Sequence, residues 1–257
     1  MMQLDPSARA AGVRHIASES VGSTNAEALS RARAGERGPL WVTAESQSAG
    51  RGRRSNSWVS PPGNLYATLL LSEPSAQAAA PQLSFVAALA LHDALAECAP
   101  QLGPQLKLKW PNDVLVGGNK IAGILIEGGS EPAFAVAIGL GVNCASHPEG
   151  TAFPATDLKD SGALVAPAQL FGALTAAMQR RLAQWQRGEG FVAVRADWLK
   201  RAAGLGEAIR VRLSERELSG RFEGLDEQGR LLLREPGGLT IVTAGEVFGL
   251  SSSNPPL

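Results

Sequence analysis

The apolar pattern of this chain changes at Gly204-Leu205-Gly206. Before this point, segments with the spacing of a helix face alternate with short apolar runs that are typical of buried strands. After it, only short strands are predicted, at residues 208–213, 217–225, 230–234 and 239–243. Roughly 45 residues are too few for a full core of their own. We therefore expect two domains, residues 1–203 and residues 204–257, the second being a small SH3-like barrel packed against the first.

The order of elements before residue 204 predicts a mixed sheet covered by helices. Thr24-Asn25-Ala26-Glu27 has the capping-box pattern, in which the Thr hydroxyl satisfies a first-turn N–H and the Glu reaches back, so a helix is predicted from there to Gly35. Residues 45–60 have no apolar period, and a loop of that length is a candidate functional site. The other predicted strands are 40–44, 64–71, 106–110, 113–116, 120–127 and 133–142, and the other predicted helices are 83–95, 167–187 and 191–201.

Charge and composition exclude several classes of protein. Lys plus Arg number 24 and Asp plus Glu also number 24, so the whole molecule lacks the positive field that gathers nucleic acid or anionic lipid. The weakly charged stretch 74–91 is interrupted by polar residues and predicts a small-residue helix instead of a membrane span. The N-terminus has no apolar segment of signal-peptide length, and Cys98 and Cys144 lack the spacing of a disulfide or zinc framework. We expect a cytoplasmic protein whose cysteines are small buried residues.

Three arginines gather in Gly50-Arg51-Gly52-Arg53-Arg54. Guanidinium groups this close together, with glycines between them, can surround a phosphate in a way that a single Arg cannot. An isolated run of this kind is more often a solvated basic loop, but the neutral overall charge argues against a nucleic-acid patch. Trp58 lies seven residues after Arg51 and offers a flat surface for a purine, although a lone Trp is more often a core residue.

Lysines gather in Lys109-Trp110-Pro111-Asn112-Asp113 and in Lys120-Ile121-Ala122-Gly123. The chain has only five lysines, and Lys107, Lys109 and Lys120 are three of them. A lysine on a strand is unfavourable unless it faces water or an anion, so one of the three is expected to point into a polar cavity. Taken alone, Lys120 is interpreted as a solvated hairpin residue. Gly123 inside a strand indicates a bulge or a close approach to the backbone.

A third motif, Ile138-Gly139-Leu140-Gly141-Val142-Asn143, is not a dinucleotide fingerprint, because no helix pattern follows it. The sequence also contains no P-loop, HExxH, EF-hand or GxSxG motif. Its histidines, His15, His92 and His147, are scattered and are interpreted as structural or surface residues. The common nucleotide and hydrolase sites are thereby excluded, and the sequence identifies no metal ligands.

In this order and at these separations, the motifs resemble those of the biotin protein ligases, over about residues 14–250. The resemblance implies an α+β fold, with a class II aminoacyl-tRNA-synthetase-like mixed sheet and covering helices plus a small C-terminal SH3-like β-barrel. It implies that biotin reacts with Mg-ATP to give biotinyl-5′-AMP and pyrophosphate, and that biotin then passes to a lysine of a biotin carboxyl carrier protein. The DNA-binding domain that precedes this core in bifunctional members has no room here. We therefore expect no DNA partner and no membrane, and an exposed sheet edge is compatible with a homodimer.

The resemblance also assigns the site residues. Lys120 and Arg53 would be catalytic: Lys120 between the biotin carboxylate and the α-phosphate, and Arg53 in the loop that closes over the acyl phosphate. Trp58 would stack on the adenine, Asn143 would hydrogen-bond to it, and no metal ligand is assigned to the Mg²⁺. We expect the loop at 45–60 to become ordered around the adenylate. The biotin set comprises Ser23, Thr24, Asn25, Gln47, Gly50, Arg51, Gly52, Lys120 and Gly123, of which Ser23, Thr24 and Gln47 would contact the ureido end. The ATP and adenylate set comprises Arg51, Arg53, Arg54, Trp58, Lys109, Asn112 and Asn143.

Two features depart from the family pattern. Where the family commonly has GRGRRGR, this chain has Arg54-Ser55-Asn56 after the first arginines. No basic residue is evident near Gly249-Leu250, where the barrel would contribute to ATP binding. A lipoate ligase shares the fold and the acyl-adenylate chemistry but fits the GRGRR and KWPND motifs poorly. A biotin sensor or an RNA-binding module could use the arginines and the barrel, and would need neither ATP nor Lys120.

Overall fold

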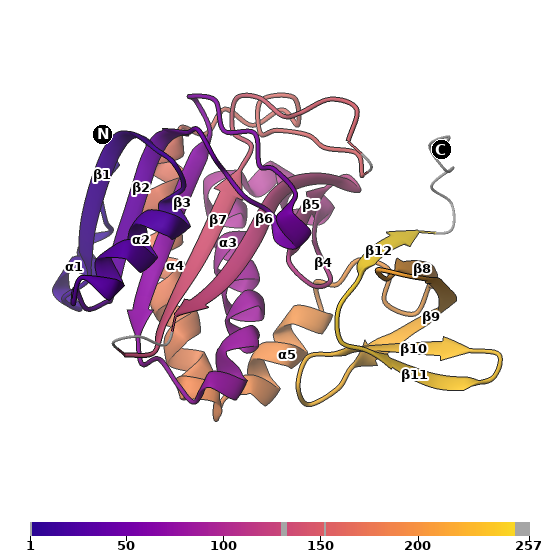
Figure 1. Ribbon diagram of the computed structural model, residues 1–257. Coiled ribbons are helices and arrows are strands. Elements are labelled where there is room, and N and C mark those ends of the chain that lie inside the picture. Colours follow the sequence, from indigo (N-terminus) through magenta and orange to yellow (C-terminus); the bar gives the residue numbers. More distant parts are fainter. Residues whose placement is uncertain (1, 130–132, 152, 250–257) are drawn as a thin grey trace.

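The main sheet has seven strands in the order β1-β2-β3-β7-β6-β5-β4. The computed structural model describes residues 2–129, 133–151 and 153–249, and Figure 1 shows its architecture. Within this sheet, β1 and β2 run parallel and the other neighbouring strands run antiparallel, so the predicted mixed sheet is confirmed. The strands are β1 (Arg14–Val21), β2 (Leu40–Gln47), β3 (Leu65–Ser72), β4 (Leu106–Lys109), β5 (Asp113–Val116), β6 (Asn119–Gly129) and β7 (Ala135–Val142).

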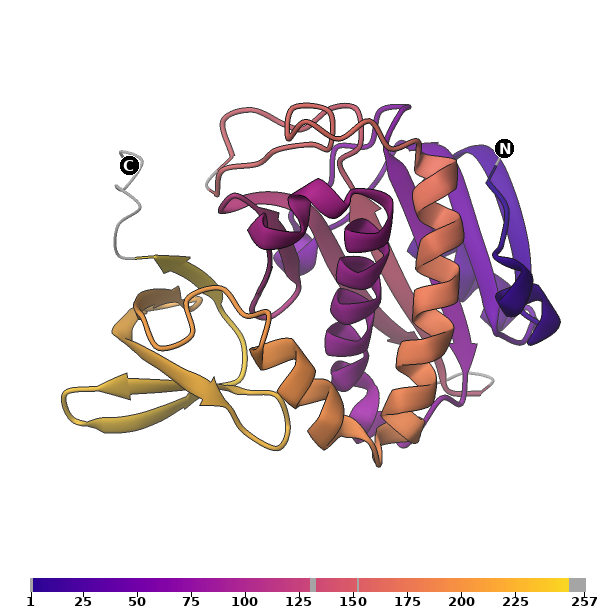
Figure 2. The same ribbon diagram turned by 180° about the vertical axis from the view of Figure 1, so that it is seen from behind.

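Helices cover both faces of this sheet unequally. Figure 2 shows α3 (Leu83–Cys98) and α4 (Pro167–Trp185) side by side against one face, with α5 (Phe191–Leu199) below them. The opposite face carries α2 (Thr24–Arg33), which is in front of the sheet in Figure 1. The short α1 (Pro6–Ala10) contacts α4. The main hydrophobic core therefore lies between the sheet and the α3–α4 layer, and a smaller apolar cluster lies under α2.

Helix α3 is apolar around most of its circumference because it is the central helix of the core. Leu83, Leu89 and Leu91 are completely buried, and each buried leucine contributes about 1.5–3 kcal/mol. With the preceding 3₁₀ turn it forms the segment Gln77–Cys98, which among the described residues is long and apolar enough to cross a membrane. Over half of its most apolar 18-residue stretch is buried inside the protein, in agreement with the predicted small-residue helix.

The N-terminus of α2 differs from the prediction by one residue. Ser23, not Thr24, is the N-cap, and its hydroxyl accepts a first-turn N–H. Thr24 lies inside the helix, and its backbone N–H and its hydroxyl both donate to Gln47 Oε1. Glu27 pairs with Arg31 one turn later instead of reaching back to the cap. The predicted capping box is therefore wrong in detail: Ser and Thr are similar caps, and the tertiary contact with Gln47 selects between them.

The edge strand β1 was not predicted from the sequence. The side chains of β1 are exposed or half-buried, since this strand has one neighbour and few apolar residues. Its register with β2 pairs Val21 with Gln47, so β2 extends three residues beyond its predicted end at Ala44. The predicted loop at 45–60 is thereby shortened to residues 48–60, which we call the Arg loop. The predicted helices at 167–187 and 191–201 are present with slightly earlier ends.

The C-terminal unit is a five-stranded antiparallel sheet in the order β11-β10-β9-β8-β12. Its turn at Gly229 meets the main domain, where Trp110 Nε1 donates to the Gly229 carbonyl at 3.0 Å. A Cβ at Gly229 would lie 2.7 Å from the Phe85 ring, so this contact requires a glycine. The predicted packing of the small unit against the main domain is thus observed (Figure 1). The strands are β8 (Ala208–Arg212), β9 (Glu217–Leu225), β10 (Leu231–Glu235), β11 (Gly238–Val242) and β12 (Glu246–Gly249), the last of which was not predicted.

Candidate active site

A cavity of about 530 Å³ lies where the Arg loop, β6, β7, the β4–β5 turn and the C-terminal sheet meet. Most of the predicted site residues line it: Ser23, Thr24, Asn25, Gln47, Arg51, Gly52, Arg53, Trp58, Lys109, Asn112, Lys120, Gly123 and Asn143. Of the described residues that were predicted for the site, Gly50 and Arg54 lie outside the lining. Three motifs separated by up to about a hundred residues therefore form one cavity.

The Arg loop is a compact turn with its own backbone bonds. Arg51 forms a β-bridge with Ser57, and the Trp58 N–H donates to the Gly50 carbonyl at 2.9 Å. Gly50 shapes the loop rather than the cavity wall, because a Cβ there would lie 2.4 Å from Trp58 O. Arg54 has φ 54° and is exposed, so this turn takes it out of the phosphate cluster predicted from sequence. Ligand-dependent ordering of the loop stays a prediction.

One end of the cavity is built from uncharged hydrogen-bonding groups. The Thr24 N–H donates to Gln47 Oε1 at 2.8 Å, and Gln47 Nε2 donates to Ser60 Oγ at 2.9 Å. Beneath them, the fully buried Thr68 hydroxyl lies 2.8 Å from Thr24 Oγ1 and 2.7 Å from Asn25 Oδ1. Such a network fixes the direction of each donor and acceptor before a ligand arrives. Thr68 and Ser60 were not predicted for the site.

The same network reaches Arg51 through Glu127 on β6. Asn25 Nδ2 donates to Glu127 Oε2 at 2.8 Å, and Arg51 Nη2 lies 3.1 Å from Glu127 Oε1. Gly139 allows this arrangement, since a Cβ there would lie 2.3 Å from Asn25 Oδ1. Arg51 is about half exposed and is held beside the uncharged end by an acidic partner that the sequence did not identify.

The other end of the cavity is cationic. Lys120 Nζ lies 2.7 Å from Asp113 Oδ1, and Lys109 Nζ lies 3.4 Å from Asp113 Oδ2. The Lys120 contact is an ion pair whose angles do not meet those of a hydrogen bond. Lys109 is 7% exposed, and its ammonium sits 3.4 Å from the centre of the Phe153 ring. Burial lowers the pKa of Lys109, while the Asp113 carboxylate acts in the opposite direction. Two lysines thus share one carboxylate, which favours the approach of a further anion.

Arg53 connects this cationic end to the C-terminal sheet. Its Nη1 donates to Asn112 Oδ1 at 3.3 Å and to the Gly245 carbonyl at 3.4 Å. Burial lowers the pKa of the Arg53 guanidinium, and the neighbouring Arg54 acts in the same direction. Asn112 also donates to the Ile124 carbonyl at 2.7 Å, which ties the β4–β5 turn to β6.

Trp58 lies flat against the glycines of the sheet. A Cβ at Gly141 would lie 2.5 Å from Trp58 Nε1, and one at Gly123 would lie 3.0 Å from the same indole. Lys120 Nζ is 5.4 Å from the ring centre. Among the described residues, the buried Trp58 Nε1 has no hydrogen-bond partner. Trp58 is therefore a wall of the cavity instead of a core residue, and Gly123 and Gly141 are explained by the close approach of its ring.

Asn143 is 3% exposed at the end of β7, and its Nδ2 donates to the Thr156 carbonyl at 3.0 Å. An amide that makes this one bond retains a second N–H and its carbonyl oxygen for a ligand. The adjacent Cys144 is buried, and burial raises the pKa of its thiol to about 12. Cys144 is therefore a neutral buried thiol, as predicted, and not a nucleophile.

Several lining residues lie outside the sequence motifs. Gly245, Glu246 and Phe248 come from the C-terminal sheet, and Phe153 comes from the connection between β7 and α4. No sequence motif around these residues predicts that they line the cavity. Gly245 and Phe153 reach it only because segments distant in the sequence pack together. Where a basic residue is missing near Gly249, the C-terminal sheet instead contributes an acidic and an aromatic side chain to the cavity.

The geometry suits a ligand with two unlike parts. A neutral polar group would satisfy the fixed amides and hydroxyls at one end, and an anionic group would be stabilised by Arg51, Arg53, Lys109 and Lys120. Trp58 and Asn143 together offer a flat surface and an amide, which can recognise a heterocyclic base. These three features describe a site for joining a small acid to a nucleotide.

Comparisons with known proteins agree with this geometry. The sequence profile of the biotin/lipoate A/B protein ligase family matches residues 18–143, and that of the biotin protein ligase C terminal domain matches residues 204–249. The biotin–[acetyl-CoA-carboxylase] ligase of Paracoccus denitrificans is 47% identical over 88% of this chain and 96% of its own length. The enzyme of the same name from Mycobacterium tuberculosis is 35% identical over 89% of this chain and 86% of its own. The structure of a biotin protein ligase from Aquifex aeolicus with biotin and ATP is similar, with a TM-score of 0.77 at 25% identity over 91% of this chain and 97% of that one.

Proposed function

The chain belongs to the biotin/lipoate A/B protein ligase family, and from this premise we propose how its cavity performs the reaction of a biotin protein ligase. It is an ATP-dependent ligase whose small-molecule substrates are biotin and ATP. The single observation that supports the residue assignments is the division of the cavity into an uncharged hydrogen-bonding end and a cationic end. Biotin has the same division, with a neutral ureido ring at one end and a carboxylate at the other.

The uncharged end binds the ureido ring in this proposal. A neutral bicycle has a large desolvation cost unless its N–H and C=O groups meet fixed partners. Ser23, Thr24 and Gln47 line this end, and Thr68 and Ser60 hold two of them in place. Asn25, Gly52 and Gly123 line the same cavity, and Arg51 lies at its rim beside Glu127.

The cationic end carries out the first step. A biotin carboxylate oxygen attacks the α-phosphorus of ATP, a C–O–P bond forms, the α–β phosphoanhydride bond breaks, and pyrophosphate leaves. Lys120 and Arg53 reduce the repulsion between the carboxylate and the phosphate and stabilise the negative charge that develops on the phosphoryl oxygens. Trp58 and Asn143 hold the adenine, and Lys109 and Asn112 line the wall beside it.

The second step transfers biotin to a protein. The ε-amine of the acceptor lysine attacks the carbonyl carbon of biotinyl-5′-AMP, an amide bond forms, and AMP leaves with the anhydride oxygen. The acceptor is a biotin carboxyl carrier protein, in keeping with the carboxylase in the names of the relatives. We place the reaction in the cytoplasm, and a homodimer through a free sheet edge stays a prediction.

Mg²⁺ fits the residues of the cationic end. The ion takes one or two carboxylates together with substrate phosphates and water. Glu246 lines the cavity on the side of Lys109 and Arg53 and would be the carboxylate that holds the ion, since Asp113 is already paired with Lys109 and Lys120. The ion would neutralise phosphate charge when bound with ATP.

ATP–pyrophosphate exchange tests this function. Purified protein is incubated with ATP, Mg²⁺ and labelled pyrophosphate, and with biotin, lipoate or no acid. Exchange with biotin alone is the expected result. Exchange only with lipoate would favour the sister activity of the family, and no exchange with either acid would favour a binding module, whose affinity for RNA would then be measured as a function of salt.

A further inference from the structure

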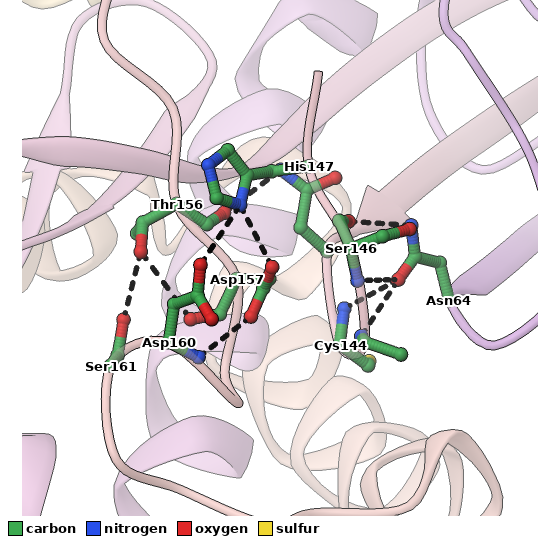
Figure 3. Close-up of polar contacts among 10 residues, drawn as sticks. Asn64, Cys144, Ser146, His147, Thr156, Asp157, Asp160 and Ser161 are labelled. Atoms are coloured by element: carbon green, nitrogen blue, oxygen red, sulfur yellow. Dashed lines mark hydrogen bonds and ion pairs between the residues drawn. The ribbon is translucent and has the colours of Figure 1, made fainter. Parts of the chain in front are cut away.

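The segment that follows β7 is clamped by a buried asparagine. Figure 3 shows Asn64, at the start of β3, pointing into this segment. Its Oδ1 accepts the consecutive N–H groups of Cys144, Ala145 and Ser146 at 2.8, 2.9 and 3.3 Å, and its Nδ2 donates to the Ser146 carbonyl at 2.9 Å. Asn64 is 3% exposed. Four bonds from one buried side chain fix the path of the chain immediately after Asn143.

A second clamp joins this segment to the chain that returns past it. His147 Nδ1 lies 2.8 Å from Asp157 Oδ2, and Asp157 Oδ1 accepts the Asp160 N–H at 2.8 Å (Figure 3). Asp157 is 2% exposed, so both of its oxygens are engaged in the protein interior. The Asp160 side chain is 62% exposed and its carboxylate is 3.8 Å from His147 Nδ1, outside hydrogen-bond distance.

The clamped chain holds the backbone of Lys120. The Lys120 N–H donates to the Pro154 carbonyl at 2.8 Å, and the Lys120 carbonyl accepts the Thr156 N–H at 2.9 Å. The Thr156 carbonyl accepts Asn143 Nδ2 at 3.0 Å, and the Leu158 N–H donates to the Asn143 carbonyl at 3.1 Å. The residue that follows Thr156 is Asp157. The position of the Asp157 backbone therefore sets that of the strand-like segment 154–158, to which both Lys120 and Asn143 are bonded.

We propose that Asn64 and the His147–Asp157 pair are positioning residues that hold Lys120 and Asn143 in register for adenylate formation. This inference rests on the proposed function of Lys120 and Asn143. The pair acts on the nucleotide side of the cavity, because the residues of the uncharged end, such as Thr24 and Gln47, are bonded to other elements. Loosening the pair would misplace Lys120 and Asn143 and leave the contacts to the ureido ring of biotin in place, and a displacement of about 1 Å costs roughly a hundredfold in rate.

The test compares two aspartates of the same turn. Asp157→Ala removes the clamp, and Asp160→Ala removes a neighbouring exposed carboxylate and keeps the backbone N–H that Asp157 accepts. Biotin-dependent ATP–pyrophosphate exchange is measured with the full chain, varying ATP at saturating biotin and biotin at saturating ATP. We expect Asp157→Ala to lower kcat/KM for ATP about tenfold to a hundredfold, with the KM for biotin within about twofold of wild type. Asp160→Ala is expected to have the same kcat/KM for ATP and the same KM for biotin as wild type.

A conservative variant keeps the test informative if Asp157→Ala unfolds. Asp157→Asn retains an oxygen that can accept the Asp160 N–H and an amide that can donate to the other tautomer of His147, so it should recover most of the exchange rate. On the Asn64 side, Asn64→Asp retains the acceptor of the three N–H groups and should exceed Asn64→Leu in kcat/KM for ATP. Thermal melts accompany each assay.

The outcomes separate the alternatives. Equal rises of both KM values with a lowered Tm would overturn the proposal in favour of a purely structural role, and a wild-type profile for Asp157→Ala would overturn it outright. A metal site at His147, Asp157 and Asp160 would replace the clamp if three results came together. Asp157→Ala and Asp160→Ala would lose the same share of exchange activity, and Asp157→Asn would be as inactive as Asp157→Ala. Wild type would also bind zinc or manganese in a titration with the metal alone. If wild type itself shows no exchange with biotin, the proposed function fails, and the clamp is not the cause.

Discussion

The Arg53 guanidinium reaches the Gly245 carbonyl at 3.4 Å, a contact between residues that are 192 positions apart in the chain. Arg53 is the central cation of the Arg loop, and Gly245 directly precedes β12, which carries Glu246 and Phe248 into the cavity. The two domains thus meet at the side chain that would close over the acyl phosphate. The C-terminal sheet therefore contributes to the end of the cavity that we assign to the nucleotide.

Arg53→Gly is expected to let biotinyl-5′-AMP escape. In the proposed assignment the substitution removes a half-buried cation that faces the acyl phosphate, and it also removes the link to the C-terminal sheet. The off-rate of the intermediate should therefore rise at least about tenfold, the value of one lost charge-assisted hydrogen bond. The measurement is the amount of labelled adenylate that stays with the protein through a desalting column. Arg54→Gly should retain the adenylate, because Arg54 is exposed outside the cavity and its φ of 54° suits glycine. Equal retention by Arg53→Gly and wild type would remove the role assigned to Arg53.

Lys120→Ala is expected to slow adenylate formation more than it weakens biotin binding. In the proposed mechanism Lys120 stabilises charge that develops during the reaction, and loss of such a group costs about a hundredfold or more in kcat. The single-turnover rate of pyrophosphate release is compared with the biotin Kd from calorimetry. Lys107→Ala is the matched control, since Lys107 is exposed on β4. Equal losses in rate and in affinity would make Lys120 a binding residue only.

Thr68→Val is expected to raise the Kd for biotin about tenfold. Valine fills the same volume but removes the hydroxyl that lies within 2.8 Å of both Thr24 Oγ1 and Asn25 Oδ1, which leaves a buried acceptor without its donor at about 1–3 kcal/mol. The comparison is Thr175→Val, another completely buried threonine whose hydroxyl bonds to Gly172 and Asp5 far from the cavity. Both variants should lower Tm, and only Thr68→Val should change the biotin Kd. If the two change biotin binding alike, the network under the uncharged end has no special role.

Acid should destabilise the helical layer through Asp93. Burial raises the pKa of Asp93, but the neighbouring His92 and the Arg181 guanidinium, which donates to the Asp93 carboxylate at 2.7 Å, outweigh it and hold the pKa at about 2, below the ordinary value of 3.8. The stabilisation is therefore complete above about pH 4 and is lost as the pH falls toward 2, because the unfolded chain binds the proton first. Wild type should lose about 1–2 kcal/mol more than Asp93→Asn between pH 5 and pH 2, measured by urea unfolding.

The control for this pH effect is Asp160→Asn, whose carboxyl is 62% exposed. Its unfolding free energy should follow that of wild type at each pH. An Asp93→Asn variant with the same pH dependence as wild type would show that the Arg181 pair does not contribute through ionisation.

Local patterns within the sequence determined much of the fold. The apolar spacing of α3 and α4, the glycine turn before β6 and the short strands after residue 204 each depend on about ten neighbouring residues, and all are present. The motifs around Arg51, Lys109 and Lys120 identified the family, and they line one cavity as expected. Helix ends and two of the edge strands were less well determined: β1 and β12 were not predicted, although the edge strands β4 and β11 were, and Ser23 replaced Thr24 as the cap.

Only the tertiary structure decided which side chains support the site. Thr68, Glu127 and Asn64 are ordinary strand or loop residues by sequence, and each acquires its partners from segments more than 40 residues away. Glu246 and Phe248 enter the cavity only because the turn at Gly229 docks the second sheet against α3 and α5. Periodicity and propensity act over a few residues and specify elements, whereas the partners of a buried polar group are set by the packing of whole elements. The sequence therefore determined the elements and the reactive motifs, and the packing determined how those motifs are held.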